Sequence, residues 1–267
     1  MTAGTQSVAR LTDNRGLVLL ARVGLIGYGI VHLLIAWLAA QVALGSGGEE
    51  AGKGGALHRI AEESWGTALL WVIAVGLFAL ALWQLGEAVW GRKSYSGALR
   101  RIPPVVEALV LAFLGWSAAK VATGGKSQSN EEQAGLAQQV LDAPGGQILV
   151  AAAGLAVIGA AVYLVHKGLT ERFTRDLDFS GASPATRRTT TRLGKVGHSA
   201  QGIAYGIVGA LVVVAAIRYD ADKATGLDTA LATLAAQPYG TILLLLVALG
   251  LACFGLYCFL DARFRRP

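Results

Sequence analysis

Six ionisable residues stand inside or at the ends of long apolar runs of this 267-residue chain. They are Arg22, Glu87, Glu107, Lys167, His198 and Asp261. Ionisable groups are costly in lipid, and those that occur there line ion or proton pathways or pair with one another. Long charged side chains also reach the membrane surface, so structural roles alone can explain such residues. We therefore expect one polar cluster near one membrane surface, with structural pairing as the favoured interpretation and Glu107 bound to Arg22.

Two further patterns suggest chemistry but are incomplete. Residues 47–53 (GGEEAGK) match the GxxxxGK core of a phosphate-binding loop. That motif also needs Ser or Thr after the lysine and a strand before it, whereas here glycine follows and an apolar run precedes. His166 and His198 stand near one membrane surface, and paired histidines can ligate haem iron, but no other feature supports a haem. We therefore expect no catalytic residues, no metal site and no cofactor.

The elements that must position these residues are apolar helices. The chain is 54% hydrophobic and only 15% charged, with a mean hydropathy of +0.53, whereas soluble domains carry about 25% charged residues. Six apolar runs occur at roughly 17–44, 67–90, 104–122, 147–169, 197–217 and 240–262. About 20 apolar residues cross a bilayer as a helix. The alternation of a membrane β-strand is absent from residues 241–252 (TILLLLVALGLA). The sequence predicts an all-α membrane protein with six transmembrane helices.

The runs repeat a common pattern. The letters YGIV occur at residues 28–31 and again at 205–208, an offset of 177. In the helices that follow, residues 65–67 (WGT) match 239–241 (YGT) at an offset of 174 and 145–147 (GGQ) at an offset of 80. The first and third runs align at an offset of 79. Self-similarity of this kind indicates a repeated structural unit.

The unit is a hairpin of two helices that occurs three times. The hairpins cover residues 15–91, 98–172 and 192–266, and 173–191 form a flexible cytoplasmic linker rich in Gly, Ser, Pro and Thr. One repeat position is shared by Glu87, Lys167 and Asp261, and another by Trp83, Tyr163 and Tyr257. Repeat symmetry therefore places the ionisable residues around a common axis.

Each hairpin loop contains a short amphipathic segment, at residues 55–66, 135–146 and 226–240. Small or apolar residues recur there at helical spacing, so each segment has one apolar face. Such a helix can lie on the membrane surface or pack on the outer end of the protein itself, and the sequence leaves both alternatives open.

The repeats, with their Tyr-Gly and aromatic-Gly positions, resemble the bacterial membrane proteins of the domain-of-unknown-function family 1206 (DUF1206). The resemblance covers nearly the whole chain and implies three two-helix modules. It implies no activity, because no catalytic or binding residues are established for that family.

Charge sets the expected orientation. By position, 17 of the 23 basic residues fall on the side of the membrane that carries both termini. Basic residues concentrate on the cytoplasmic side, so we expect a multi-pass protein of the cell membrane with both termini in the cytoplasm. The same basic face suits anionic lipid headgroups, and nucleic-acid binding is not needed to explain it.

Gly202 and Gly206 form a GxxxG pattern in the fifth run. This spacing lets two membrane helices approach closely. The partner is either another helix of this chain, which is the default, or a helix of a second copy.

Three classes of function remain. A non-enzymatic membrane scaffold or accessory subunit is favoured, because the loops are short and no catalytic constellation is recognisable. The alternative is a small transporter, channel or lipid-binding protein that uses the polar cluster, and an enzyme is least favoured. The expected partners are membrane lipids and either a membrane-protein partner or further copies of the chain.

Overall fold

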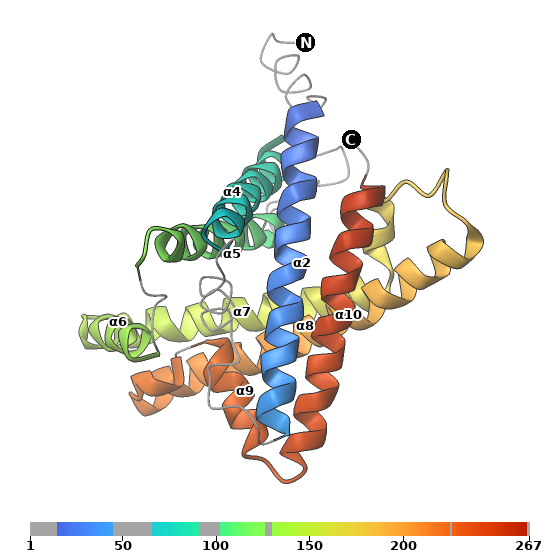
Figure 1. Cartoon of the computed structure of the whole chain (residues 1–267). Coiled ribbons are helices and arrows are strands. Elements are labelled where there is room, and N and C mark those ends of the chain that lie inside the picture. Colours follow the sequence, from blue (N-terminus) through green and yellow to red (C-terminus); the bar gives the residue numbers. More distant parts are fainter. Residues whose placement is uncertain (1–14, 45–65, 91–101, 126–129, 225, 266–267) are drawn as a thin grey trace.

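The computed structural model describes residues 15–44, 66–90, 102–125, 130–224 and 226–265 (Figure 1). Eight α-helices occur there: α2 (Arg15–Ala43), α4 (Gly66–Trp90), α5 (Ile102–Ala122), α6 (Asn130–Asp142), α7 (Gly146–Leu169), α8 (Pro184–Arg218), α9 (Leu227–Ala235) and α10 (Gly240–Phe264). Two 3-10 turns, η2 (Arg172–Asp176) and η3 (Ala221–Ala224), complete the elements. In the part of the chain that the structure describes, the only β contact is an isolated bridge, so the prediction of an all-α protein is confirmed.

Four helices are long and apolar enough to cross a membrane. They are residues 22–43 of α2, and α7, α8 and α10, while α4 contributes a shorter apolar stretch over Gly66–Leu82. Large apolar side chains are exposed on these helices, including Trp37 (63%), Leu82 (64%) and Leu246 (61%). An extensively apolar outer surface is typical of a protein that lipid surrounds. Length and composition therefore indicate a membrane protein.

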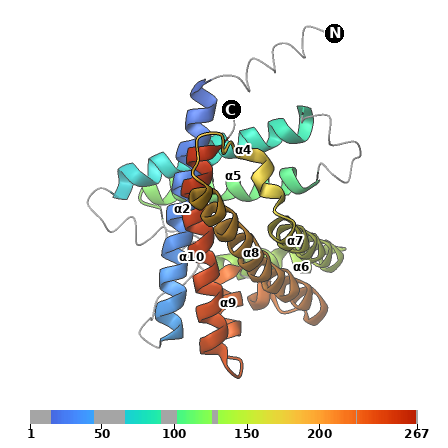
Figure 2. The same ribbon diagram turned by 90° about the vertical axis from the view of Figure 1, so that its right-hand side faces the viewer.

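The main helix pairs join neighbouring repeats. The second helix of each repeat packs along the first helix of the next, so α4 lies on α5, α7 on α8, and α10 on α2 (Figures 1 and 2). Within repeats, α2 packs on α4 and α8 on α10. The helices of the middle repeat, α5 and α7, touch only marginally. The expected arrangement of three hairpins is therefore not confirmed.

Small residues set the register of the α2–α10 pair. A Cβ atom added to Gly29 would lie 2.8 Å from the carbonyl oxygen of Gly255. The repeat offsets carry Gly29 to Gly206 on α8 and Gly255 to Ala161 on α7. These two residues also face each other, because a Cβ atom on Gly206 would lie 3.7 Å from Ala161 Cβ. The α2–α10 and α7–α8 pairs thus share one register.

The α4–α5 pair has the same register. A Cβ atom on Gly115 of α5 would lie 3.3 Å from the carbonyl oxygen of Ala74 on α4. The same offsets carry Gly115 to Val213 and Ala74 to Gly154. A Cβ atom on Gly154 would lie 2.7 Å from Val213 Cγ2. All three interfaces between repeats are therefore versions of one interface, which supports the internal repeat directly.

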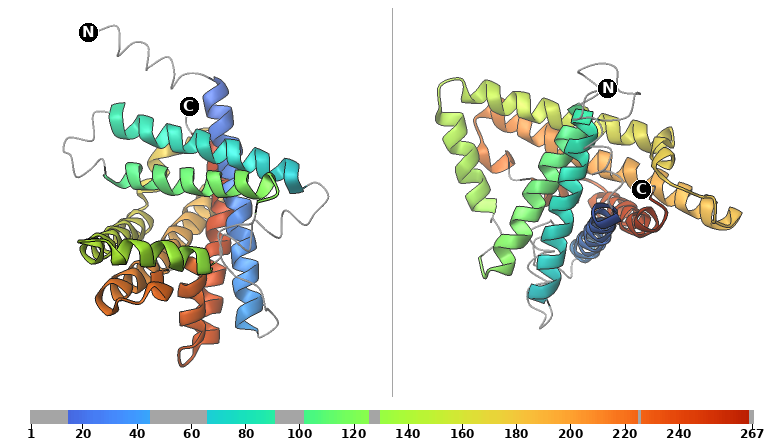
Figure 3. Two further views of the ribbon diagram at one scale, coloured as in Figure 1. Left: turned by 90° about the vertical axis from the view of Figure 1, so that its left-hand side faces the viewer. Right: turned by 90° about the horizontal axis from the view of Figure 1, so that it is seen from above.

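The three pairs do not share one axis direction. The helices α2 and α10 stand upright in Figure 1, whereas α7 and α8 run across the view. Seen from above, α2 and α10 appear end-on while the other two pairs lie in the plane (Figure 3). A bundle of six parallel spans is thus not confirmed. The start of α2 and the end of α10 lie at the same end of the molecule (Figure 1).

Two of the three loop segments are helical as expected. The helix α6 covers most of the second segment and α9 most of the third, while residues 55–65 lie outside the described residues. Of the shared aromatic position, Tyr257 is buried and Tyr163 half-buried, and the side chain of Trp83 is not among those described.

The linker contains more regular structure than its composition predicts. The helix α8 begins at Pro184, well before the apolar run, because Ser183 Oγ accepts a hydrogen bond from the Thr186 amide at 3.1 Å. Proline is favoured in the first helical turn, where no amide hydrogen is needed. Before it, the Asp178 amide donates to the Phe264 carbonyl oxygen at 2.6 Å. Residues 173–191 are therefore attached to the end of α10 and continue into α8.

Candidate functional site: the buried polar cluster

The two tyrosines of the repeated YGIV meet at one glutamine. Gln201 of α8 is buried and donates from Nε2 to the Tyr28 hydroxyl oxygen at 2.9 Å. The same Nε2 lies 3.5 Å from the Tyr205 hydroxyl and 3.5 Å from His32 Nε2. Buried polar groups need such partners, since an unsatisfied one costs about 1–3 kcal/mol. The repeated tyrosines therefore share one polar environment between α2 and α8.

Backbone carbonyls fix the tautomers of two buried histidines. His32 Nδ1 lies 2.8 Å from the Tyr28 carbonyl oxygen, and His198 Nδ1 lies 2.8 Å from the Gly194 carbonyl oxygen. A carbonyl oxygen only accepts, so Nδ1 carries the hydrogen in each ring. In the neutral ring Nε2 is then the acceptor, which suits the approach of the Gln201 amide to His32. Both histidines are thus held in one orientation by their own helices.

Aromatic rings enclose the histidines. Phe254 of α10 lies edge-on to His32 at 4.8 Å between centroids and to His198 at 5.2 Å. Phe173 stacks on His198 at 5.0 Å with an interplanar angle of 10°, and Tyr257 packs edge-on at 5.0 Å. Edge-to-face and offset-stacked pairs are the favoured aromatic geometries. The surroundings of both rings are therefore tightly packed and largely apolar.

The predicted charged residues gather at one end of this polar core. Arg22 Nη2 donates to the Arg265 carbonyl oxygen at 3.3 Å, and Asp261 Oδ1 lies 3.7 Å from Arg265 Nε. Glu107 and Lys167 lie within electrostatic range of each other and of Arg265, and Lys167 also lies within range of Asp261. The structure thus brings together charged residues from all three repeats.

Three predicted residues differ in their relation to the charged group. His198 packs on the end of α7 that carries Lys167, because a Cβ atom on Gly168 would lie 3.1 Å from His198 Cβ. Glu87 belongs to α4, but its side chain lies outside the described residues. The ion pairs of the described residues do not include the expected pair of Glu107 with Arg22, and α2 and α5 both pack on α4.

Two buried polar atoms of the charged group have no hydrogen-bond partner, and a third such atom, Ser199 Oγ, lies on the side of α8 that faces Gly168. Among the side chains that the structure describes, the unpartnered atoms include Arg22 Nε and Asp261 Oδ1. These two atoms belong to residues that already contact Arg265. The charged group therefore retains unused hydrogen-bonding capacity. The described residues contain no group of three or more His, Cys, Asp or Glu side chains placed to hold a metal ion.

Gln201 and Arg265 are the residues that sequence reasoning missed. Gln201 has no polar counterpart in the first repeat, because the offset of 177 carries it to Gly24. The available signal was a single amide inside an apolar run, next to Gly202. Gly202 itself packs on α7, since a Cβ atom there would lie 2.8 Å from the Ala161 carbonyl oxygen. The GxxxG pattern therefore contacts a helix of the same chain.

Comparisons with known proteins agree with the repeat architecture. A family model described as Domain of Unknown Function (DUF1206) matches residues 23–91, 104–171 and 196–265. Uncharacterized protein YxxB of Bacillus subtilis (strain 168) is 30% identical over 240 residues, which cover 88% of this chain and 86% of that protein. No solved structure matches the chain. The three matched segments together cover most of the sequence, and the chain belongs to the DUF1206 family.

Proposed function

We propose that the chain is a multi-pass protein of the cell membrane that acts as a non-enzymatic scaffold or accessory subunit. Six transmembrane helices with both termini in the cytoplasm remain the arrangement that the apolar runs and the basic residues favour. The observation that carries the proposal is the internal pairing of the polar core around Gln201. The polar groups around Gln201 bond to one another, so this part of the core needs no ligand to complete it.

Close contacts between helices support a scaffold function. The α2–α4 crossing brings Gly24 against Gly76, and the α8–α10 crossing brings Gly197 against the backbone of Phe254. Glycine at such positions lets helix backbones touch, and van der Waals packing of this kind stabilises helix association in lipid. Helices joined in this way suit a scaffold better than a protein whose halves must slide past each other.

A small transporter, channel or lipid-binding protein is the second candidate. The observation that favours it is the unused hydrogen-bonding capacity of Arg22 and Asp261 at the charged group. Intramembrane ionisable residues mark functional pathways by default. This alternative requires water to reach the polar core, whereas the scaffold requires the core to stay dry.

Native Cys258 can distinguish the two candidates. It is buried on α10, on the same helix as Asp261 of the charged group. The chain contains only two cysteines, so Cys253→Ala leaves Cys258 as the single target. A small hydrophilic thiol reagent is applied to open membrane fragments, so that both faces are reached. The scaffold predicts no modification until the protein is denatured in detergent, and modification of the folded protein would favour the transporter or channel.

A matched control shows that the reagent is active. Ser180→Cys in a variant that lacks both native cysteines places a thiol at an exposed position of the same molecule. We expect rapid and complete modification of this thiol under the same conditions.

A further inference from the structure

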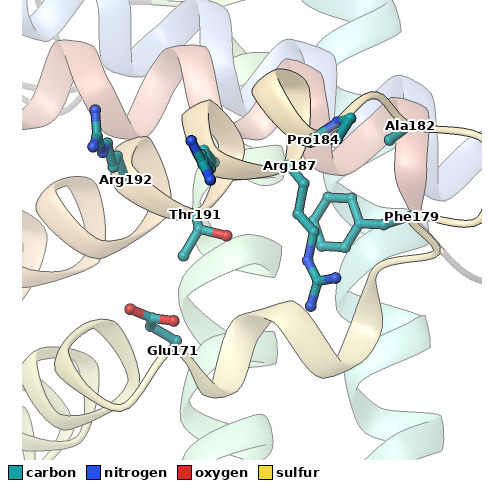
Figure 4. A pocket seen from close by; sticks show the side chains of 8 residues that line it. Glu171, Phe179, Ala182, Pro184, Arg187, Thr191 and Arg192 are labelled. Atoms are coloured by element: carbon teal, nitrogen blue, oxygen red, sulfur yellow. The ribbon is translucent and has the colours of Figure 1, made fainter.

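A basic cavity lies at the start of α8, away from the polar core. Its volume is about 570 Å³, and Glu171, Phe179, Arg187, Arg188, Thr191 and Arg192 are among the side chains that line it (Figure 4). Three of these six side chains carry a permanent positive charge. We propose that this cavity binds the phosphate group of an anionic phospholipid headgroup.

Positive charge is in excess in the cavity. Its one lining carboxylate, Glu171, pairs instead with Lys195, at 3.7 Å between Oε1 and Nζ. Within the described part of the chain, Arg187, Arg188 and Arg192 form no ion pair with a carboxylate. The planar guanidinium group binds phosphate oxygens through two parallel hydrogen bonds, so free arginines in a cavity favour this ligand over a simple halide.

The fold holds one arginine in place before any ligand arrives. The Arg187 guanidinium carbon lies 5.7 Å from the centre of the Phe179 ring, and Figure 4 shows the two side by side. This cation–π contact limits the side-chain motion that binding would otherwise have to restrict. Arg188 and Arg192 are four residues apart on α8, which places them on the same helix face.

The position of the cavity along α8 favours a lipid headgroup as its ligand. This step rests on the proposed membrane-spanning role of α8. The helix has 35 residues, and about 20 suffice to cross the hydrocarbon layer. The charged part of α8 ends at Lys195, and Arg192 then lies about 7 Å from the apolar stretch that begins near Gly197. The headgroup layer is about 5–8 Å thick on each side. Arg192 therefore lies at headgroup depth, and Arg188 lies one turn further out with a long side chain that can reach back.

Binding of short-chain lipids to the purified full-length protein in neutral detergent tests the proposal. Dihexanoyl phosphatidylglycerol is the anionic probe, dihexanoyl phosphatidylcholine the zwitterionic probe, and inorganic phosphate the soluble probe. We expect saturable binding of the anionic lipid, and the double variant Arg188→Gln/Arg192→Gln should weaken it about tenfold or more, because two charge-assisted hydrogen bonds are lost. Both side chains are exposed, so the variant should fold normally.

The control variant removes the same charge elsewhere. Arg175 and Arg263 are exposed and do not line the cavity. The variant Arg175→Gln/Arg263→Gln should change the affinity less than about twofold, because only long-range attraction is reduced. Equal losses in the two variants would overturn the proposal, since they would mean diffuse attraction to a basic surface.

Two other outcomes would also overturn it. Equal affinity for phosphatidylcholine would show that the net charge of the headgroup does not determine binding. Equal affinity for inorganic phosphate would assign the cavity to a soluble anion. Extraction of the protein from membranes by alkaline carbonate distinguishes failure of the lipid site from failure of the proposed membrane-spanning role. If the protein resists extraction but does not bind the anionic lipid, only the lipid site is wrong; if carbonate extracts it, the proposed membrane-spanning role fails.

Discussion

Replacing Gly29 with alanine tests the contact that joins the first and last helices of the fold. The new Cβ atom would lie 2.8 Å from the Gly255 carbonyl oxygen and 3.1 Å from Cys258 Cβ. The nearest atom belongs to the backbone, so α2 and α10 must separate by several tenths of an ångström. Overpacking of this kind costs about 1–3 kcal/mol, and the better helix propensity of alanine returns about 1 kcal/mol. We therefore expect Gly29→Ala to be neutral or to destabilise the protein by up to about 2 kcal/mol.

Gly206 supplies a matched control at the same repeat position. It stands in the same tetrapeptide, YGIV, and a Cβ atom there would meet Ala161 Cβ at an ordinary 3.7 Å. Gly206→Ala should thus gain helix propensity without a clash and stabilise the protein by up to about 1 kcal/mol. The two substitutions should differ by about 1–3 kcal/mol, which is the overpacking cost alone.

Thermal unfolding in detergent measures this difference. A change of 1 kcal/mol moves the midpoint by about 2–4 °C in a chain of this size, so the two midpoints should differ by about 2–12 °C, with Gly29→Ala lower. Both variants are compared at one scan rate and one detergent concentration, because membrane proteins often unfold irreversibly. Equal midpoints would refute the reasoning, because they would mean that the α2–α10 contact has room for the added methyl group.

Three further predictions concern the polar groups and the topology. Gln201→Leu and Tyr28→Phe should be coupled by about 0.6–1.7 kcal/mol in a double-mutant cycle on thermal stability, because each removes one end of the same buried hydrogen bond; additive losses would contradict that bond. Arg22→Ala and Glu107→Ala should instead be additive within about 0.5 kcal/mol, because the two side chains do not pair, and a larger coupling would restore the ion pair that the sequence suggested. A single cysteine at Ser129, which lies outside the described residues, should be labelled in intact cells by an impermeant reagent, and failure to label would reverse the proposed orientation.

The repeat offsets were the most informative part of the sequence. They assigned Gly29 and Gly206 to one position, and the structure places both at equivalent helix contacts. The loop helices α6 and α9 were also predictable, because their apolar residues recur at helical spacing. These features are local or periodic, so a single sequence carries them.

Helix pairing was not predictable in the same way. The long helices are apolar on most sides, so hydrophobic periodicity does not indicate which face meets which neighbour. For this reason the sequence favoured a pair of Arg22 with Glu107, whereas Arg22 contacts the Arg265 carbonyl oxygen at the end of α10. Gln201 was missed because its importance depends on Tyr28, which is 173 residues away. The early start of α8 was missed because the composition around Ser183 resembles that of a linker.

The shared register of the three interfaces between repeats has a consequence for assembly. Each interface is of the head-to-tail kind, in which two different surfaces meet, and such contacts either close into a ring or continue into a filament. Here the third repeat docks back on the first through α10 and α2, so the ring closes within one chain. The contacts between repeats then do not depend on which repeat comes first in the chain. A circularly permuted chain that begins at the second repeat, with the old termini joined at the end where both helices already lie together, should build the same structure.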